Sequence, residues 1–302
     1  METLTGRKIG SLRKWSYNNV GLIFIAPWIL GFLFFTLYPF IDSLLNSFTD
    51  TRGARTGNFI GFDNYVHMFT VDLRFWQSVR VTLLYVIMTL PMRLGFALFI
   101  AMLLNMKLRG VNLYRTFYYI PSLLGGGVAV SIVWRMLFLR TGVINQMLAT
   151  VGISPVGWLS DPNIALFTIS LLSVWQFGSS MVIFLAGLKQ IPNELYEAAR
   201  VDGASKIRIF FKITLPMLTP VILFNLVMQM INAFQEFTSA FIITDGGPLQ
   251  GTFLYAFKLF VEAFRNFRFG YASALSWVLF IVIVLVTALI FKVANRFVHY
   301  EN

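Results

Sequence analysis

The chain has 302 residues, of which 57% are hydrophobic and only 12% are charged, whereas a soluble domain has about 25% charged residues, so the composition predicts a membrane protein. The net charge of +11 fits the excess of Lys and Arg in cytoplasmic loops better than it fits nucleic-acid binding. The absence of cysteine excludes disulfides, thiolate metal sites and cysteine nucleophiles, and His67 and His299 are too far apart in the sequence to suggest a metal site.

Six apolar segments are predicted to cross the bilayer as helices. Most of them reach the roughly 20 residues that a helix needs to span the hydrocarbon. In chain order they are Val20–Leu45, Val79–Leu104, Pro121–Phe138, Ile164–Leu188, Leu215–Phe234 and Tyr271–Val293. The predicted fold is therefore an all-α, six-span membrane domain at residues 20–295, between tails at residues 1–19 and 296–302.

The distribution of Lys and Arg predicts the orientation. The N-terminal tail, the loops after the second and fourth segments and the C-terminal tail together hold 14 Lys and Arg residues and 5 Asp and Glu residues. The other loops and span edges hold 9 Lys and Arg residues and 8 Asp and Glu residues. Because cytoplasmic loops collect Lys and Arg, the first set is expected to be cytoplasmic, with both termini inside.

One cation, Arg93, lies within the second segment. An arginine at the centre of a spanning helix costs about 3 kcal/mol on insertion scales, so it is expected to find a partner inside the protein. A structural ion pair is the first expectation, and contact with an anionic sugar is the alternative.

The loop after the fourth segment, at about residues 189–214, differs in composition from the rest of the chain. It contains the sequence NELYEAARVDGAS, in which three acids, an arginine and three alanines fall within thirteen residues. Asn193 is predicted to cap a short helix, and Gly203 to end it in a left-handed conformation. Ser205 is predicted to cap a second short helix through Lys212. Because small side chains let another backbone approach closely, we interpret this loop as a docking element.

The same loop resembles a family signature. Glu197-Ala198-Ala199, then Gly203 after three residues, Ile213 after nine more, and Leu215-Pro216 after one more, matches the EAA signature of bacterial ABC importer permeases at every spacing. Other stretches resemble the sugar-transport branch of that family, from about Pro27 to Asn295. They are PWILGFLFFTLYPFIDSLLNSFTD, GFDNYVHMF, AMLLNMKLRGVNLYRTFYYIPSLL, TDGGP and FGYASALSWVLF.

The resemblance implies a type I ABC importer permease fold and a multi-pass location in the bacterial cytoplasmic membrane. In that family the EAA loop forms a coupling helix that docks in a groove of a separate ATPase. The implied coupling residues are Glu197, Ala198, Ala199, Asp202 and Gly203. This chain lacks a G-x-x-x-x-G-K-[ST] phosphate loop, so we expect a transport subunit and not an enzyme. No cofactor is expected in this chain, and ATP and Mg²⁺ are expected in the partner subunits.

The implied assembly contains several partners. They are a second homologous permease, two cytoplasmic ATPase subunits, an extracytoplasmic solute-binding protein, a sugar substrate and membrane lipid. The best-known maltose permease of the family has extra spans and a large extracytoplasmic domain, which are not expected in this chain. Contact with a binding protein is therefore expected through the modest outer loops, at about residues 46–78 and 235–270.

A polar stripe on the fifth segment is a candidate substrate path. Its residues recur at i, i+4, i+7 and i+11, within an arc of about 60° on one helix face, and they are Asn225, Gln229, Asn232 and Glu236. The fourth segment adds a similar face with an aromatic ring, formed by Ser173, Gln176, Ser180 and Trp175. Amides, hydroxyls and rings suit a sugar. Hydrogen bonding that holds the spans together is the alternative. Leu226 is expected to face lipid.

Three other functions are alternatives to a sugar importer. An importer permease for another solute, such as glycerol phosphate or a peptide, shares the architecture, but TDGGP and GYASA argue against the peptide branch. A secondary transporter is expected to show interrupted half-helices or a buried proton relay, and neither is clear in the sequence. A membrane enzyme is expected to gather His, Cys or paired carboxylates near a span end, and this sequence does not.

Overall fold

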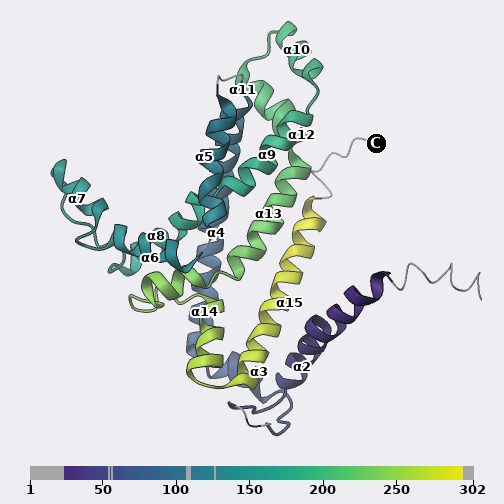
Figure 1. The fold of residues 1–302 in the computed structure, drawn as a ribbon, viewed down its shortest axis with the longest axis vertical. Helices are drawn as coiled ribbons and strands as arrows, with labels where there is room; N and C mark the ends of the chain where they lie inside the picture. Colours follow the sequence, from purple (N-terminus) through teal and green to yellow (C-terminus); the bar gives the residue numbers. More distant parts are fainter. Residues whose placement is uncertain (1–23, 54, 56, 107–109, 126, 295–302) are drawn as a thin grey trace, which may run out of the picture.

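The computed structural model describes residues 24–53, 55, 57–106, 110–125 and 127–294. Within these ranges the chain is helical, with two isolated antiparallel bridges, Thr49–Phe59 and Arg52–Arg55. The predicted tails at residues 1–19 and 296–302, and with them His299, lie outside the described residues. Figure 1 shows an elongated bundle with α10 at one end and α3 at the other, and we call these the α10 end and the α3 end.

Helix α4 (Leu73–Asn105) is the centre of the bundle. Its 33 residues correspond to about 50 Å at 1.5 Å per residue, and Figure 1 shows it running between the two ends. It packs against α8 (Pro162–Trp175), α9 (Gly178–Gln190) and α13 (Thr219–Phe234). Asp72 caps its first turn, because the carboxylate Oδ1 accepts the backbone N–H of Phe75 at 3.1 Å.

The described helices provide up to six spans, as predicted. Four stretches are long and apolar enough to cross a membrane, and two bent helix pairs pass the same test. The four stretches are Phe24–Asn46, Leu73–Asn105, Val128–Thr150 and Phe269–Ala294. The first includes η1 (Leu33–Leu37) and α2 (Tyr38–Asn46), the third includes α6 (Val128–Phe138) and α7 (Val143–Thr150), and the last is α15.

The predicted third segment is not one helix. Helix α5 (Val111–Leu124) begins well before the predicted start at Pro121, and it ends at Gly125. Gly125 has a φ of +62°, a left-handed conformation that glycine adopts without steric cost. The chain then enters α6 from Gly127 in an extended conformation. The predicted continuous helix from Pro121 to Phe138 is therefore wrong, because the glycines break it.

The fourth and fifth segments are bent. Helices α8 and α9 meet at 48°, and the rod Lys206–Met217 meets α13 at 66°. That rod consists of α11 (Lys206–Ile209), the π-helical turn η2 (Phe210–Thr214) and α12 (Leu215–Met217). Pro220 in the first turn of α13 has no backbone N–H, so it cannot continue the helical hydrogen bonding of the rod. The rod and α13 pass the length and hydropathy test together, so the fifth span is a bent helix pair that begins before the predicted start at Leu215.

The first span lies apart from most of the bundle. Within its apolar window no residue is buried, and α2 packs on α15. The contact includes a hydrogen bond from Trp277 Nε1 to Ser43 Oγ at 3.0 Å. The Phe40 and Trp277 rings also meet, with centroids 4.6 Å apart. Figure 1 shows α2 next to α15 and away from α13.

Buried charges join the elements at the α3 end, where α3 (Asp63–Thr70) and α14 (Tyr255–Phe260) lie. Lys258 Nζ lies 2.6 Å from Asp72 Oδ2 and 3.3 Å from Glu262 Oε1, and its side chain is 1% exposed. Tyr271 Oη donates to the same Asp72 oxygen at 2.6 Å. We call these four residues the Lys258 network.

Near the same end, the motifs TDGGP and GYASA each have a glycine at a position where other atoms lie too close for a side chain. Gly246, in TDGGP, has a φ of +79°, and a Cβ there would lie 2.7 Å from Phe257. Gly270, in GYASA, donates its N–H to Thr51 O at 3.1 Å, and a Cβ there would overlap the Thr49 carbonyl. Both motifs therefore allow loops to pack tightly.

Candidate functional site

The predicted loop helix is present as α10, Asn193–Val201. Its C-terminal signal is confirmed, because Gly203 has a φ of +73° and donates its N–H to Arg200 O at 3.1 Å. Ala204 N–H reaches Ala199 O at 2.9 Å, which completes a Schellman motif. The predicted N-cap was wrong by one residue. Pro192 holds that position in an extended conformation, and Asn193 is the first helical residue.

A second helix, α11, follows after a four-residue turn at residues 202–205. Ser205 Oγ accepts the N–H of Arg208 at 3.3 Å, so the predicted cap is confirmed. The helix does not stop at Lys212 as predicted, because η2 and α12 carry it to Met217.

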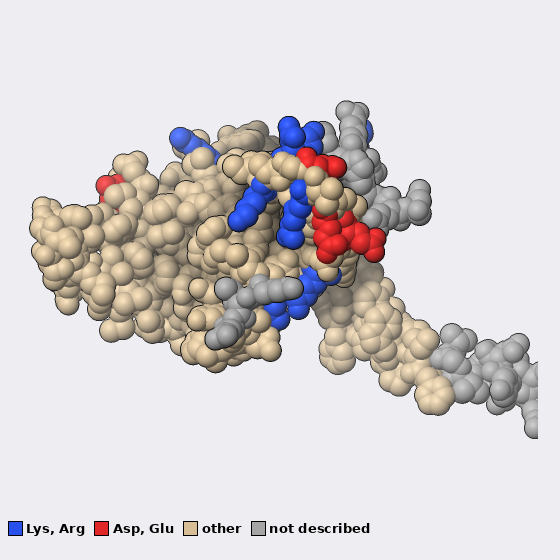
Figure 2. Space-filling view, turned by 90° about the horizontal axis from the view of Figure 1, so that it is seen from above, with Lys and Arg blue, Asp and Glu red and all other residues tan. Residues whose placement is uncertain are grey.

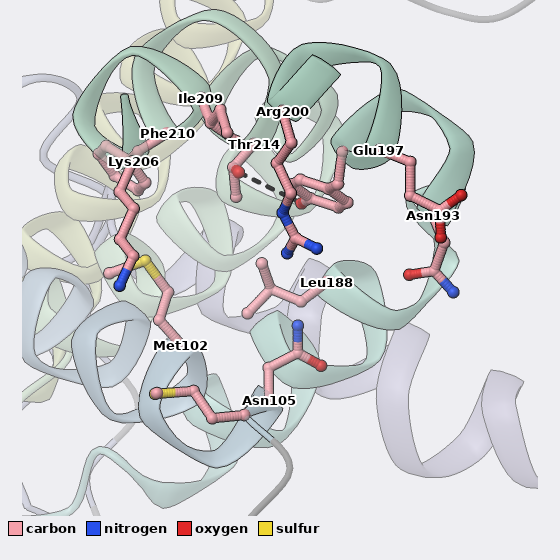
Figure 3. A pocket seen from close by; sticks show the side chains of 12 residues that line it. Met102, Asn105, Leu188, Asn193, Glu197, Arg200, Lys206, Ile209, Phe210 and Thr214 are labelled. Carbon is pink, nitrogen blue, oxygen red and sulfur yellow. Dashed lines mark hydrogen bonds between the residues drawn. The ribbon is translucent and has the colours of Figure 1, made fainter. Parts of the chain in front are cut away.

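One side of α10 is anchored to the bundle. Tyr196 Oη lies 3.2 Å from Thr214 Oγ1, the dashed contact in Figure 3. The Tyr196 ring packs against a buried apolar cluster that includes Leu188, Ile191 and Leu218. These contacts attach the loop to the ends of α9 and α13 and leave the other side of α10 uncovered.

Most of the predicted coupling residues are accessible at this loop. Glu197, Ala198, Asp202 and Gly203 are exposed and Ala199 is half-buried. All five lie on α10 or in its C-terminal turn. Figure 2, which looks down on the α10 end, shows acidic side chains gathered beside Lys and Arg side chains. The surface is thus charged, with the acidic and basic groups separated.

Sequence reasoning missed the apolar part of this surface. Val201 is 87% exposed and Ile207 is 72% exposed, and Leu195 and Phe211 are exposed as well. Large apolar side chains in this position suggest a protein-contact surface. The signal was available, because these residues interrupt an otherwise polar loop.

A cavity of about 600 Å³ lies between this loop and the ends of α4 and α9. Figure 3 shows Arg200 projecting into it toward Leu188 and Asn105, while Lys206 projects toward Met102. The Glu197 carboxylate points to the far rim, near Asn193. The interior of the cavity is therefore cationic.

Within the spans, Gln176 connects two helix breaks. Its amide Nε2 donates to Gly125 O at 2.8 Å. Its backbone carbonyl accepts from Ser122 Oγ at 2.9 Å, and Ser122 Oγ accepts from Ser179 N at 3.1 Å. A Cβ at Gly178 would lie 2.6 Å from Tyr118 O, so α5 and α9 meet at close range. Gln176, predicted to line the path, is buried and fixes this junction.

Arg93 also contacts this junction. Its Nη2 donates to Gln176 O at 2.8 Å, and none of the salt bridges among the described residues includes Arg93. The expected ion pair is therefore not formed in this part of the chain. The partial negative charge at the C-terminus of α8 takes the place of a carboxylate.

The other predicted path residues divide by burial. Ser173 bonds Tyr85 Oη at 2.7 Å. Ser180 and Asn225 are fully buried and Gln229 is 7% exposed, and each has a side-chain polar atom without a hydrogen-bond partner. The structure thus places these residues inside the chain, on α8, α9 and α13.

Asn232, Glu236 and Trp175 lie elsewhere. Asn232 is exposed on α13, and Trp175 is 37% exposed. Glu236 lies beyond the end of α13 at Phe234, where its carboxylate accepts from Ser239 N at 2.9 Å. The four-residue stripe is therefore not continuous on one helix. Leu226, expected to face lipid, is partly buried against the core.

Comparison with known proteins identifies similar chains. Residues 71–300 match the family described as "Binding-protein-dependent transport system inner membrane component". The chain is 52% identical to the probable ABC transporter permease protein YesP of Bacillus subtilis (strain 168), over 98% of this chain and 96% of YesP. It is 34% identical to the lactose transport system permease protein LacF of Rhizobium radiobacter, over 95% of this chain and 97% of LacF.

A solved structure shares the fold. A chain of a bacterial alginate ABC transporter, crystallised in complex with a periplasmic protein bound to alginate pentasaccharide, matches with a TM-score of 0.80. The match covers 94% of this chain and 96% of that chain, at 22% identity. At that identity the match shows the arrangement of the helices, and it does not identify the transported solute.

Proposed function

We propose that this chain, which belongs to the family of binding-protein-dependent transport system inner membrane components, forms half of the membrane path of an ATP-driven oligosaccharide importer. It is a membrane transport subunit and not an enzyme. The coupling role is supported by the position of α10. Tyr196 anchors one side of this helix to the bundle, and the other side is uncovered.

A sugar is the solute class that the relatives favour. LacF, named as a lactose permease, matches this chain along nearly its whole length. A relative named for a disaccharide makes a short oligosaccharide the first substrate to test. Importers of glycerol phosphate are expected to share this architecture, so glycerol phosphate is the alternative solute to include in the test.

The proposed assembly joins this chain to a second homologous permease, two cytoplasmic ATPase subunits and an extracytoplasmic solute-binding protein. The exposed apolar residues Val201 and Ile207, flanked by separated charges, suit insertion into a groove of an ATPase. ATP and Mg²⁺ then act in those partner subunits. The complex is proposed to lie in the bacterial cytoplasmic membrane, with the α10 end facing the cytoplasm because Lys and Arg concentrate in its loops.

The sugar path is proposed to follow the face of α13 that exposes Asn232. A second permease facing this surface would enclose a polar path, and Asn232 offers both a donor and an acceptor to sugar hydroxyls. Asn225 and Gln229 are buried but have side-chain polar atoms without a hydrogen-bond partner. We therefore infer that they reach the path in another conformation of the transport cycle.

Cysteine labelling tests the path, because the chain has no native cysteine. Asn232→Cys should react with a hydrophilic thiol reagent in the resting complex, and Asn225→Cys should react only during turnover. Leu285→Cys is the control, since Leu285 is apolar, 63% exposed and lies on α15 and not on α13. Equal labelling of Leu285→Cys and Asn232→Cys would place the path elsewhere.

Reconstitution tests the function as a whole. The four-subunit complex in liposomes should hydrolyse ATP faster when the binding protein and its oligosaccharide are added. Gly203→Val should reduce that stimulation, because valine disfavours the left-handed conformation at this turn.

A matched control comes from Gly152, which has a φ of +78° and open space around its Cβ position, as Gly203 has. Gly152→Val carries the same backbone strain outside the coupling loop, so it should leave stimulation close to the wild-type value. Normal stimulation of the Gly203→Val complex, or an equal loss in both variants, would refute the coupling role of α10.

A further inference from the structure

The cavity beneath the coupling loop is lined by two cations and one carboxylate, those of Arg200, Lys206 and Glu197. Arg200 and Lys206 both line it, and none of the salt bridges in the described part of the chain includes either residue. Glu197, one turn before Arg200 on α10, directs its carboxylate to the rim (Figure 3). A cationic interior of about 600 Å³ suits an anionic ligand.

The chemistry of the lining points to a phosphate ester. Guanidinium and ammonium groups bind phosphate oxygens, and the amide of Asn105 can donate a further hydrogen bond. Figure 3 places the Asn105 amide below the Arg200 guanidinium. Apolar side chains form the rest of the wall, among them Met102, Met106 and Phe210. A free inorganic anion cannot make apolar contacts with that wall, whereas a phospholipid carries acyl chains next to its phosphate.

An apolar strip on α4 leads away from the cavity. Phe96, Phe99 and Leu103 fall on one face of the last turns of the helix, and each is at least 40% exposed. Met106, which follows the last helical residue, is 59% exposed and extends this strip. Met106 belongs both to this strip and to the cavity wall, so the two surfaces are continuous. A ligand with its anionic group at Arg200 can therefore lay a hydrocarbon chain along α4.

The position along the span agrees with this arrangement. Asn105 is the last residue of α4, so the cavity lies where this span leaves the hydrocarbon. Lipid phosphates lie at that level, and basic pockets between spans at the cytoplasmic side bind anionic headgroups. We propose that this cavity binds the headgroup of an anionic phospholipid, held by Arg200 and Lys206, with an acyl chain on the α4 strip.

Binding there connects lipid charge to coupling. Arg200 is on α10 and Lys206 begins the rod that leads to α13, so one phosphate bridges the two helices of the loop. The headgroup then braces the loop against α4 from below, while the opposite side of α10 stays free for a partner. This role is independent of which solute the transporter carries.

The test measures lipid retained by the detergent-purified complex. Phosphatidylglycerol and phosphatidylcholine are supplied together, and the bound molecules are counted by native mass spectrometry. The wild-type complex should retain phosphatidylglycerol selectively. The double variant Arg200→Gln with Lys206→Gln should bind it roughly 30-fold more weakly, because each Lys or Arg near an anionic lipid contributes about fivefold.

The matched control removes two charges from the same rod. Arg208 and Lys212 are exposed and do not line the cavity, so Arg208→Gln with Lys212→Gln should keep wild-type retention. Leu103→Ser, which shortens the apolar strip and keeps both cations, should also lower retention. Unchanged retention in the cavity variant, or equal loss in the control, would overturn the proposal.

Two further measurements distinguish the lipid from two other anionic ligands, a free phosphate ion and an acidic segment of the ATPase. Inorganic phosphate should not displace phosphatidylglycerol, because it cannot use the α4 strip, and displacement would assign the site to a free anion. If the cavity variant keeps its lipid but releases the ATPase, the cations bind an acidic segment of the ATPase and the lipid proposal fails. Neither readout needs the transported solute, so failure here leaves the sugar-import proposal standing.

Discussion

The two ends of the bundle handle their charges in opposite ways. At the α3 end, Lys258 is buried between Asp72 and Glu262, and Tyr271 adds a hydrogen bond to the same cluster. At the α10 end, Arg200 and Lys206 face a cavity and form no salt bridge within the described residues. The buried charges at the α3 end are therefore paired within the chain, whereas the two cations at the α10 end are left for a partner.

This difference separates a fixed end from a docking end. Buried, fully bonded networks hold one geometry, because removing any partner strands a charge. Exposed helices with few buried residues open at low free-energy cost and are suited to binding. None of the residues of α10 is buried, whereas Tyr255, Phe257 and Lys258 of α14 are. Substitutions at the two ends should therefore affect different measurements.

The largest effect is expected from Lys258→Met. Removing the ammonium group leaves Asp72 and Glu262 as neighbouring buried carboxylates, which should cost about 3–5 kcal/mol of stability. Thermal unfolding of the detergent-purified complex, followed by size-exclusion chromatography, measures the loss.

Arg265→Gln is the control for Lys258→Met, because the Arg265–Asp245 pair is close to half exposed on both sides. An exposed pair is worth at most about 1 kcal/mol, so this variant should unfold near the wild-type temperature. If the two variants unfold at the same temperature, the Lys258 network is not the stabilising feature of the α3 end.

Two glycines with the same backbone conformation give the second comparison. Gly246→Ala adds a Cβ that meets Phe257 at 2.7 Å and Phe253 at 2.9 Å, and should cost about 2–4 kcal/mol from strain and overpacking together. Gly203→Ala adds a Cβ with no atom within 4 Å, so only the strain of about 1–2 kcal/mol applies. Unfolding temperatures rank the two, and a larger loss at Gly203 would contradict the ranking.

A smaller effect is expected from Ser205→Ala. Loss of the bond to the Arg208 N–H should destabilise the start of α11 by about 1 kcal/mol. Because the loop is local and exposed, hydrogen exchange at residues 205–209 should rise while the unfolding temperature of the whole complex stays constant. A fall in that temperature would mean that the loop contributes to global stability.

The smallest effect is a pH dependence at the α3 end. Burial alone would raise the pKa of Asp72, but the hydrogen bonds from Lys258 and Tyr271 and the Lys258 charge hold that pKa below its usual value. A depressed carboxyl pKa contributes stability above the unfolded pKa of about 4, and this contribution is lost as the pH falls through the folded value. Unfolding temperatures below pH 4 should therefore drop in the wild type and less steeply in Asp72→Asn.

Local chemistry explains what the sequence could predict at the α10 end. The left-handed turn at Gly203 and the cap at Ser205 depend on residues within five positions of one another, and both predictions were confirmed. The apolar lengths likewise predicted the number of spans. The bend at Leu218 was missed because hydropathy does not register Pro220, which breaks the helix without interrupting its apolar run.

Long-range contacts explain what the sequence left open. The Lys258 network joins Asp72 to residues in α14 and α15, and its Tyr271 contact spans 199 positions. Nothing local to Arg93 indicated that its partner is the carbonyl of Gln176, because that carbonyl is free only where α8 breaks. The cavity beneath α10 likewise depends on α4 and α9 meeting the loop in space.

The Lys258 network also orders the biogenesis of the chain. Synthesis delivers Asp72 and α4 to the membrane long before Lys258 and Tyr271 leave the ribosome. Until then the Asp72 carboxylate stands at the head of a span without its ammonium partner. A chain interrupted before Lys258 therefore keeps an unpaired carboxylate, and the pairing becomes possible only once Lys258 has been synthesised.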